Sequence, residues 1–328
     1  MTTPSRDATF AEQSNRRLAR TLNVGLDLGS PTKPGWVADV TDDLLGQCAR
    51  AGFTAIRLVT SMALHTLAAG APRLDPRALE RVEQAINAAT GHGLAVVLAN
   101  MLDPELMADP PRHRERLLAC TGQLAASIKH HGASVVLEPL SEPHHNLDPV
   151  WNDYLSDLCA AVREVDPVRT IIAGPHTYNN PRFLHELSLP DSERNLILTV
   201  HHYWPIMFTM QGETWLGRTE LGDPATWLGT TWDADPQQRG ELHAGFDAIA
   251  TYARSHQRPV FIGEFGTSNN ADVPSRVRWA RFNRQLAEQH GFAWGYWSYG
   301  PTFALRDADH DRWHPELLRA LIPSSTQP

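Results

Sequence analysis

The sequence contains few cysteines and no long apolar run. The three cysteines, Cys48, Cys120 and Cys159, lack C-x-x-C spacing, which argues against a disulfide framework or a zinc site. No stretch approaches the ~20 apolar residues of a membrane span. Residues 1–21 are polar and contain no apolar run of signal-peptide length. We therefore expect a cytoplasmic protein with no membrane partner and with buried, reduced cysteines.

An excess of basic residues is also missing. The chain has 29 Lys and Arg against 37 Asp and Glu, a net charge of −8, so it lacks the basic footprint of a nucleic-acid-binding protein. H-E-x-x-H, P-loop, G-x-S-x-G and G-x-G-x-x-G motifs do not occur in a supporting context. The sequence therefore predicts no nucleic-acid partner, no metal and no cofactor.

Short apolar runs alternate with amphipathic segments along most of the 328 residues. Such alternation is typical of strand–helix units, and eight units predict an α/β protein with a (β/α)8 TIM barrel. A doubly wound sheet is the alternative, but it would not need eight units in so even a rhythm. The predicted strands are residues 24–28, 55–59, 94–99, 134–140, 170–173, 196–200, 260–263 and 292–297.

The domain organisation is predicted to be simple. Residues 1–22 are polar and contain several arginines, so we expect a flexible N-terminal extension. Residues 23–328 are then one catalytic barrel domain, because no linker or repeat interrupts them. The long segment 203–235 is the one irregular region, and we expect it to cover the cleft at the C-terminal ends of the strands.

Two glutamates follow apolar runs at which surface charges are not expected. Glu142 comes just after the fourth run, and Glu264 closes the seventh. Because the C-terminal ends of barrel strands meet at one face, the two carboxylates can face each other across a cleft. A pair of this kind suits an acid/base and nucleophile mechanism on a glycoside.

Further side chains at strand ends are candidates for the same site. Arg57 can hold a nearby carboxylate ionised, although a salt bridge inside the barrel rim explains it equally well. His201 and Tyr203 fall on one face of their strand, with His202 on the other. Trp297 closes the last run and can either stack on a sugar ring or pack in the core.

Several motifs together resemble glycoside hydrolase family 5, the clan A barrels. The resemblance runs from Asn23 to about Leu321 and rests on four segments. These are VLEPLSEP at 136–143, HHYWP at 201–205 with FTMQG at 208–212, IGEFG at 262–266, and GYWS at 295–298.

The resemblance implies a retaining hydrolase that needs no metal or organic cofactor. Carried over by position, it implies Glu142 as general acid/base and Glu264 as nucleophile. Arg57 would support the nucleophile, and Trp297 would form the floor of the subsite for the sugar being cleaved. His201 and Tyr203 would orient groups around Glu264. Trp204, in the same segment, is included among the expected substrate-binding residues.

Two positions depart from the family pattern. Ser141 stands where the family has an asparagine that binds the sugar 2-hydroxyl, and serine cannot copy the donor and acceptor pair of an amide. Met101 stands where a histidine is usual, and methionine is a poor hydrogen-bonding group. Both changes remove polar groups from one subsite, while both glutamates are kept.

We therefore hypothesise a retaining β-glycosidase-like hydrolase that acts on a small or unusual glycoside, such as a 2-deoxy or 2-substituted sugar of specialised metabolism. Two other classes stay open. One is a biosynthetic or transglycosylating enzyme that uses the two glutamates for other chemistry, and the other is a sugar-binding protein without turnover. The separation of the two carboxyl groups is the observation that distinguishes them, because ~5–5.5 Å fits retaining glycoside cleavage.

Overall fold

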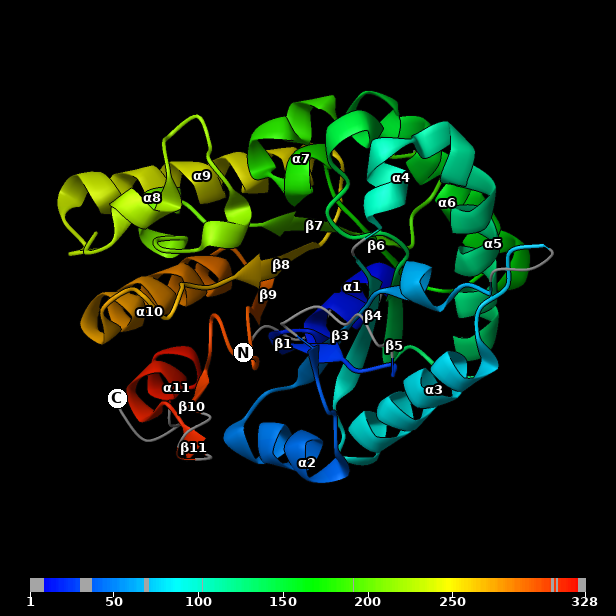
Figure 1. The fold of residues 1–328 in the computed structure, drawn as a ribbon, viewed down its shortest axis with the longest axis horizontal. Helices are drawn as coiled ribbons and strands as arrows, with labels where there is room; N and C mark the ends of the chain where they lie inside the picture. Colours follow the sequence, from blue (N-terminus) through cyan, green and yellow to red (C-terminus); the bar gives the residue numbers. More distant parts are fainter. Residues whose placement is uncertain are drawn as a thin grey trace.

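The computed structural model describes residues 9–29, 37–67, 71–101, 103–190, 192–307, 310 and 312–323. Its centre is a barrel of eight parallel strands surrounded by helices (Figure 1). Neighbouring strands follow one another in chain order, and Leu22 in the first pairs with Tyr296 in the last, which closes the barrel. The (β/α)8 fold and all eight predicted strands are confirmed, although the bounds of several strands differ from the prediction. The barrel strands are β1 (Arg20–Leu26), β3 (Ala55–Thr60), β4 (Ala95–Asn100), β5 (Val135–Glu138), β6 (Ile171–Ala173), β7 (Leu196–His201), β8 (Val260–Phe265) and β9 (Ala293–Tyr296), and β2 (Val37–Ala38) pairs with β1.

Several outer helices begin at a residue whose side chain caps them. For example, Thr41 accepts a hydrogen bond from the backbone N–H of Leu44 at the start of α2, and Gly52 ends that helix with φ 101°. None of the helices in the described ranges is both long and apolar enough to cross a bilayer. The helices are α1 (Phe10–Arg17), α2 (Asp42–Ala51), α3 (Pro76–Gly91), α4 (Pro104–Ala108), α5 (Pro110–Ile128), α6 (Trp151–Val165), α7 (His176–Asn179), α8 (Ile206–Thr209), α9 (Pro236–Ser255), α10 (Val273–Gln289) and α11 (Pro315–Leu321).

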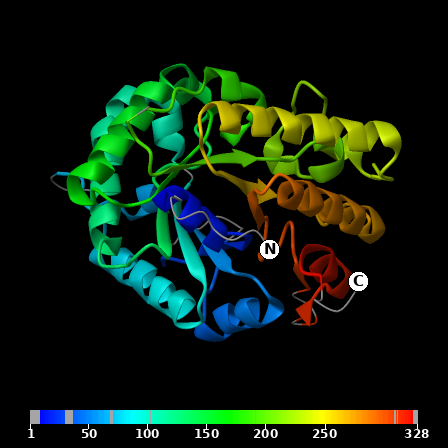
Figure 2. The same ribbon diagram turned by 180° about the vertical axis from the view of Figure 1, so that it is seen from behind.

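The helix α1 corrects part of the predicted N-terminal extension. Within the segment 1–22, α1 is ordered and β1 already begins at Arg20. In Figure 2, α1 lies across the end of the barrel. Its buried side chains are small or polar: the Ser14 hydroxyl lies 3.0 Å from that of Thr170, and Asn15 donates to the backbone of Val260 at 3.0 Å. The helix therefore closes the N-terminal end of the barrel.

The interior of the barrel is layered. Strand side chains alternate between the inside and the surrounding helices, and the layer next to α1 is apolar, with alanine, branched aliphatic and phenylalanine side chains. One step further along β1, β3 and β5 the interior becomes polar. Asn23, Arg57 and Glu138 are each fully buried there. This polar layer supports the groups at the C-terminal face, where barrel enzymes carry their sites.

Candidate active site

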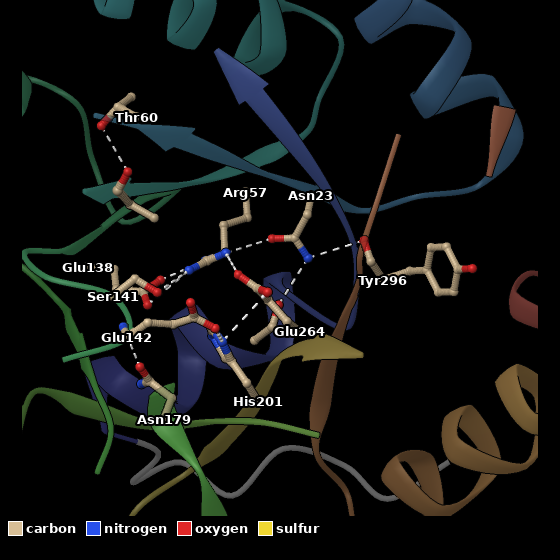
Figure 3. A network of polar contacts seen from close by, with 12 residues as sticks. Asn23, Arg57, Thr60, Glu138, Ser141, Glu142, Asn179, His201, Glu264 and Tyr296 are labelled. Atoms are coloured by element: carbon tan, nitrogen blue, oxygen red, sulfur yellow. Dashed lines mark hydrogen bonds and ion pairs between the residues drawn. The ribbon is translucent and has the colours of Figure 1, made fainter. Parts of the chain in front are cut away.

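Arg57 lies at the centre of a buried polar network (Figure 3). Its Nε and Nη2 donate to Glu138 at 2.7 and 3.1 Å, and a second Nη2 bond reaches Ser141 Oγ at 2.7 Å. Its Nη1 donates to Asn23 Oδ1 at 2.8 Å and to Glu264 Oε1 at 2.7 Å. All five N–H donors of the guanidinium are therefore used, as a fully buried arginine requires. The network fixes Glu264 relative to the barrel.

Glu264 points into the barrel because the strand register shifts beside it. Phe261 is in the interior layer and Ile262 packs outside it, so strict alternation would turn Glu264 outward. The pairing of β7 with β8 shifts between Val200 and His201, which places His201 opposite Glu264. Such irregularities commonly re-aim side chains next to active sites, and here the shift brings the carboxylate to Arg57.

Glu142 follows β5 and comes close to Glu264. Its Oε1 lies 2.8 Å from His201 Nδ1, and the same nitrogen lies 3.6 Å from Glu264 Oε2. An oxygen of each carboxylate and a His201 nitrogen all lie within 4.8 Å of one another. The Glu142 side chain is 24% exposed and that of Glu264 only 4%. The two carboxylates thus face each other, and Glu142 is the one open to solvent.

The residues after β7 divide between the two sides of the strand, as predicted. Tyr203 donates its hydroxyl proton to Glu264 Oε2 at 2.9 Å. His202 instead packs between the barrel and the helices, with its ring 5.1 Å from that of Phe246. Glu264 therefore holds one hydrogen bond on each oxygen, from Arg57 and from Tyr203, and such donors favour the ionised carboxylate.

Burial shifts the pKa of both facing glutamates upward. It raises the pKa of Glu142 to about 7, against the opposing charges of Arg57 and His144. Burial also raises the pKa of Glu264, while His201 in its protonated form and the charge of Arg57 act to lower it. Glu142 thus has a pKa near neutral pH, and the neighbouring Glu264 carboxylate is bound by an arginine. Two environments that differ in this way let one carboxyl act as the acid and the other as the nucleophile.

The surrounding groups are set in the protonation states that the network needs. Burial opposes the charge of Glu138, but the charge and hydrogen bonds of Arg57 hold the pKa of that carboxyl below its usual range. Burial lowers the pKa of His201, so its ring is neutral near pH 7. Burial also raises the pKa of Tyr203 well above its usual value, so the phenol remains a donor.

An apolar wall lies beside these polar groups. Met101 and Trp297 are buried in one cluster against which the Tyr203 ring packs. Asn100, next in sequence to Met101, accepts from the N–H of Met62 and donates to the Pro139 carbonyl, so its amide serves the backbone. The buried members of the cluster are Val59, Met101, Met210, Trp227, Trp297 and Phe303. The segment 203–235, predicted to cover the cleft, contributes Met210 and Trp227 to this wall.

Trp204 is the predicted substrate-binding residue that the structure does not bring to the site. Its indole N–H donates to Glu241 of α9 at 3.0 Å, and the guanidinium of Arg182 lies 4.8 Å from its ring centre. Alternation explains this, because Trp204 follows Tyr203 and so turns the opposite way. Arg57, Ser141 and His201 gather around the two glutamates (Figure 3). Tyr203 joins them through its hydrogen bond to Glu264, and Met101 and Trp297 line the wall.

Three site residues were not predicted from the sequence. Asn23 and Glu138 both lie within apolar strand runs and bind Arg57, and a polar residue inside such a run is a signal that could have identified them. Asn179 accepts a hydrogen bond from the backbone N–H of Glu142. No sequence pattern marks it, since it lies far from Glu142 along the chain.

Two groups of side chains in the described residues bring together atoms able to bind a metal. One is Glu142, His201 and Glu264. The other is on the surface, where His130 and His131 both contact Glu83, at 2.9 and 3.2 Å. The two rings of the surface group are 4.2 Å apart, so their nitrogens point side by side at one carboxylate. This arrangement is a tilted ring pair in which each ring has one contact with Glu83, and the absence of a metal cofactor stays a prediction.

Comparison with known proteins gives one family. A family model for cellulase (glycosyl hydrolase family 5) matches residues 21–302. Endoglucanase H of Acetivibrio thermocellus is 27% identical over 95% of this chain, and cellulase/esterase CelE of the same organism is 25% identical over 92%. This chain spans 34% and 39% of the length of those two proteins.

Solved structures agree in fold over nearly the whole chain. Cel5A of Thermotoga maritima, in complex with cellobiose, is 33% identical with a TM-score of 0.89, covering 94% of this chain and 99% of that one. The cellulose synthase subunit Z of Clostridioides difficile is 27% identical with a TM-score of 0.85, covering 92% and 99%.

Proposed function

The chain belongs to glycoside hydrolase family 5, and we propose that it cleaves a β-glycoside with retention of configuration, with Glu264 as nucleophile and Glu142 as general acid/base. The observation that carries the assignment is the approach of the two carboxylates, because one oxygen of Glu142 lies within 4.8 Å of one oxygen of Glu264. Retaining glycosidases hold their carboxyl groups ~5–5.5 Å apart, whereas inverting enzymes leave room for a water between them. The same separation argues against chemistry that needs two distant carboxylates.

The reaction proceeds in two displacements. A carboxylate oxygen of Glu264 attacks the anomeric carbon as the bond to the leaving oxygen breaks, and the Glu142 proton passes to that oxygen. A water then attacks the anomeric carbon of the glycosyl-enzyme. Glu142 takes its proton, and Glu264 leaves as the carboxylate. An acceptor alcohol in place of water would give transglycosylation by the same steps.

The environment of each glutamate supports its role. Glu264 receives hydrogen bonds from Arg57 and Tyr203. These donors stabilise the negative charge of the carboxylate before it attacks and again when it leaves in the second displacement. Glu142 has a pKa of about 7, so near neutrality it is protonated often enough to act as acid and ionised often enough to act as base. His201 contacts Glu142 at 2.8 Å and lies 3.6 Å from Glu264, so it fixes their relative position.

The substrate is proposed to be a small or unusual glycoside. Ser141 is fully buried, and its hydroxyl bonds Arg57 and Glu138, so it does not reach a sugar. Met101 belongs to the apolar wall. A site without partners for a hydroxyl does not discriminate against a sugar that lacks the hydroxyl. A sugar that is deoxygenated or substituted at C2 therefore loses less binding free energy in this site than in a site with an amide at position 141.

A β-1,4-glucan is the second candidate substrate. It is favoured by the comparisons, because the relatives are endoglucanases and a related structure holds cellobiose. The two candidates differ in one respect that can be measured. If the substrate is a glucan, the absence of polar groups at positions 101 and 141 lowers activity on it. If the substrate is an altered sugar, the same absence favours activity on that sugar over glucose.

The test is turnover of aryl β-glucoside, β-mannoside, β-galactoside and 2-deoxy forms, together with soluble β-1,4-glucan. Wild type is assayed beside E142Q and E264Q, which keep the shapes of the side chains. Activity that is abolished in both variants supports the proposed roles, and the preferred substrate identifies the sugar. Absence of turnover on every substrate would contradict the proposal and favour sugar binding alone or non-glycosidic chemistry.

The double variant S141N/M101H tests the altered pocket separately. We expect it to raise activity on the glucoside or mannoside relative to the 2-deoxy form, because it returns two polar groups to the subsite. If the ratio of these activities does not change, the proposed selectivity for an altered sugar is wrong, even where hydrolysis itself is observed.

A further inference from the structure

The backbone of Glu142 is in a conformation that non-glycine residues rarely adopt. Its φ is 54°, in the left-handed region. A residue held there at a functional site needs support from its surroundings, since an unsupported loop would relax to an ordinary conformation. The contacts of the Glu142 main chain are therefore the place to look for what positions its carboxyl.

That support comes from the short segment α7 after β6, which is a left-handed turn and not a regular α-helix. Thr177, Tyr178 and Asn179 are consecutive and all left-handed, with φ of 53°, 64° and 55°. Two backbone N–H groups of the turn bind the segment that follows Glu142. The N–H of Tyr178 donates to the Pro143 carbonyl at 3.0 Å, and the N–H of Thr177 donates to Asp148 Oδ1 at 2.9 Å. The two segments, which are distant in sequence, thus form one unit.

Asn179 makes the contact that reaches Glu142 itself (Figure 3). Its Oδ1 accepts the backbone N–H of Glu142 at 2.5 Å, and the side chain is 1% exposed. Only the oxygen of the amide can accept from an N–H, so this bond fixes which way the amide faces. Its Nδ2 lies over Gly174, where an added methyl group would come within 2.3 Å. The amide therefore occupies a closely fitted space that exists because residue 174 has no side chain.

We infer that Asn179 is a positioning residue for Glu142: its side-chain carbonyl holds the Glu142 main chain left-handed and so directs the carboxyl toward His201 and Glu264. The inference rests on the proposed function, in which Glu142 is the general acid/base. Asn179 touches no reacting atom in this arrangement. Its effect is confined to the proton transfers of Glu142, which gives a proton in the first displacement and takes one in the second, and attack by Glu264 does not depend on it.

A confined effect of this kind has a distinctive signature. Leaving groups that form strongly basic anions need a proton from the acid, whereas the weakly basic dinitrophenolate departs without one. Loss of Asn179 should therefore slow the cleavage of phenyl or alkyl glycosides far more than that of a dinitrophenyl glycoside. Damage to the whole site would instead slow both to the same degree.

The variant N179G removes the side chain and keeps a residue that is at ease with positive φ. We expect kcat/KM for the phenyl glycoside to fall ~10–100-fold, a share of what general acid catalysis contributes, and for the dinitrophenyl glycoside to stay within about threefold. Asn180 gives a matched control, because its side chain caps the next turn by accepting from Arg182 N–H at 3.0 Å. N180G should retain the wild-type ratio between the two substrates.

Rescue separates positioning from simple structural support. N179D keeps an oxygen that can accept from the Glu142 N–H, so it should recover most of the phenyl-glycoside activity. Its negative charge, placed near Glu142, should also move the basic limb of the pH profile to higher pH. An N179D enzyme as impaired as N179G, with an unmoved basic limb, would overturn the inference.

A readout without turnover keeps the inference separate from the proposed function. His201 Nδ1 lies 2.8 Å from Glu142 Oε1, so its 15N chemical shift should follow the ionisation of Glu142 in the wild-type protein. In N179G that dependence should be lost. If N179G retains it, or loses activity equally on both leaving groups, Asn179 does not position Glu142. Inactivity of the wild type on all glycosides would contradict the proposed function and leave the NMR comparison to decide the positioning.

Discussion

Ser141 Oγ accepts a hydrogen bond from Arg57 Nη2 at 2.7 Å and is fully buried. The residue before Glu142 therefore serves the buried arginine and does not face the cleft. This relationship explains how a departure from the family pattern can coexist with an intact pair of glutamates. The serine hydroxyl accepts one of the guanidinium hydrogen bonds. Residue 141 therefore contributes no polar group to the substrate side, where an asparagine side chain would do so.

The first prediction concerns S141A. Removing the hydroxyl leaves one buried Arg57 donor without a partner, which should lower the free energy of unfolding by about 1–3 kcal/mol. KM for the best glycoside should change less than about threefold, because the hydroxyl does not contact substrate. Chemical denaturation and steady-state kinetics measure the two effects. S127A, which removes a helix-surface hydroxyl bonded to Leu124, is the control and should stay within about 0.5 kcal/mol. A large KM change without destabilisation in S141A would place Ser141 in the substrate site.

The second prediction is a bell-shaped pH dependence of kcat/KM. Glu264 must be ionised to attack, so activity rises as pH increases through the elevated pKa of Glu264. Glu142 must be protonated to act as acid, so activity falls as pH rises through about 7. The two limbs belong to the coupled pair rather than to single residues. Rates that keep rising well above pH 8 would contradict the assignment of Glu142 as the acid.

The third prediction concerns the hydroxyl of Tyr203. Y203F removes the 2.9 Å bond to Glu264 Oε2 and keeps the ring that packs against Phe303. The carboxylate loses a donor, so the pKa of Glu264 should rise further and the acidic limb should move to higher pH. Near pH 6 we expect a loss of about tenfold in kcat/KM, on the scale of one hydrogen bond to a charged group. Y252F is the control, because Tyr252 donates to the Leu187 carbonyl away from the site, and its pH profile should match the wild type.

The fourth prediction links Glu142 to stability. Its pKa rises from 4.5 to about 7 on folding, so the protonated carboxyl stabilises the folded state below about pH 4.5, and this contribution is lost as pH rises through 7. Glutamine is neutral at every pH. The free energy of unfolding of E142Q minus that of wild type should therefore increase between pH 5 and pH 8.5, by up to about 3 kcal/mol. Denaturant unfolding of both proteins at the two pH values measures this change. A stability difference that is the same at both pH values would mean that the pKa of Glu142 is not raised.

Much of the fold could be predicted from the sequence, because barrel strands buried on both faces leave continuous apolar runs. The N-terminal helix could not, because its buried face consists of Ala11, Ser14 and Asn15 and has no apolar stripe. The capping pair of Thr9 and Glu12 was the available signal. The cytoplasmic location stays a prediction.

The candidate site was predictable where function and position on a strand coincide. Glu264 and Arg57 stand inside strands, and barrel topology places both near the C-terminal face. The inward turn of Glu264 depends on the register shift beside His201, which the sequence does not indicate. Trp204 was misplaced because an aromatic residue near a site gives no information about which way it turns. Asn179 could not be found at all, since its contact with Glu142 depends on a left-handed turn that the sequence does not indicate. Loop geometry, unlike strand alternation, is set by tertiary contacts.

The most direct test of the central claim is to trap the glycosyl-enzyme. E142Q lacks the acid/base, so a dinitrophenyl β-glycoside should still glycosylate Glu264, whereas the breakdown of the intermediate, which needs the base, should be slow. Mass spectrometry should show one added glycosyl group on the intact protein and locate it to Glu264 in the peptide that contains Phe265. An adduct on another residue, or turnover that releases the α-anomer without any adduct, would contradict retaining catalysis by this pair.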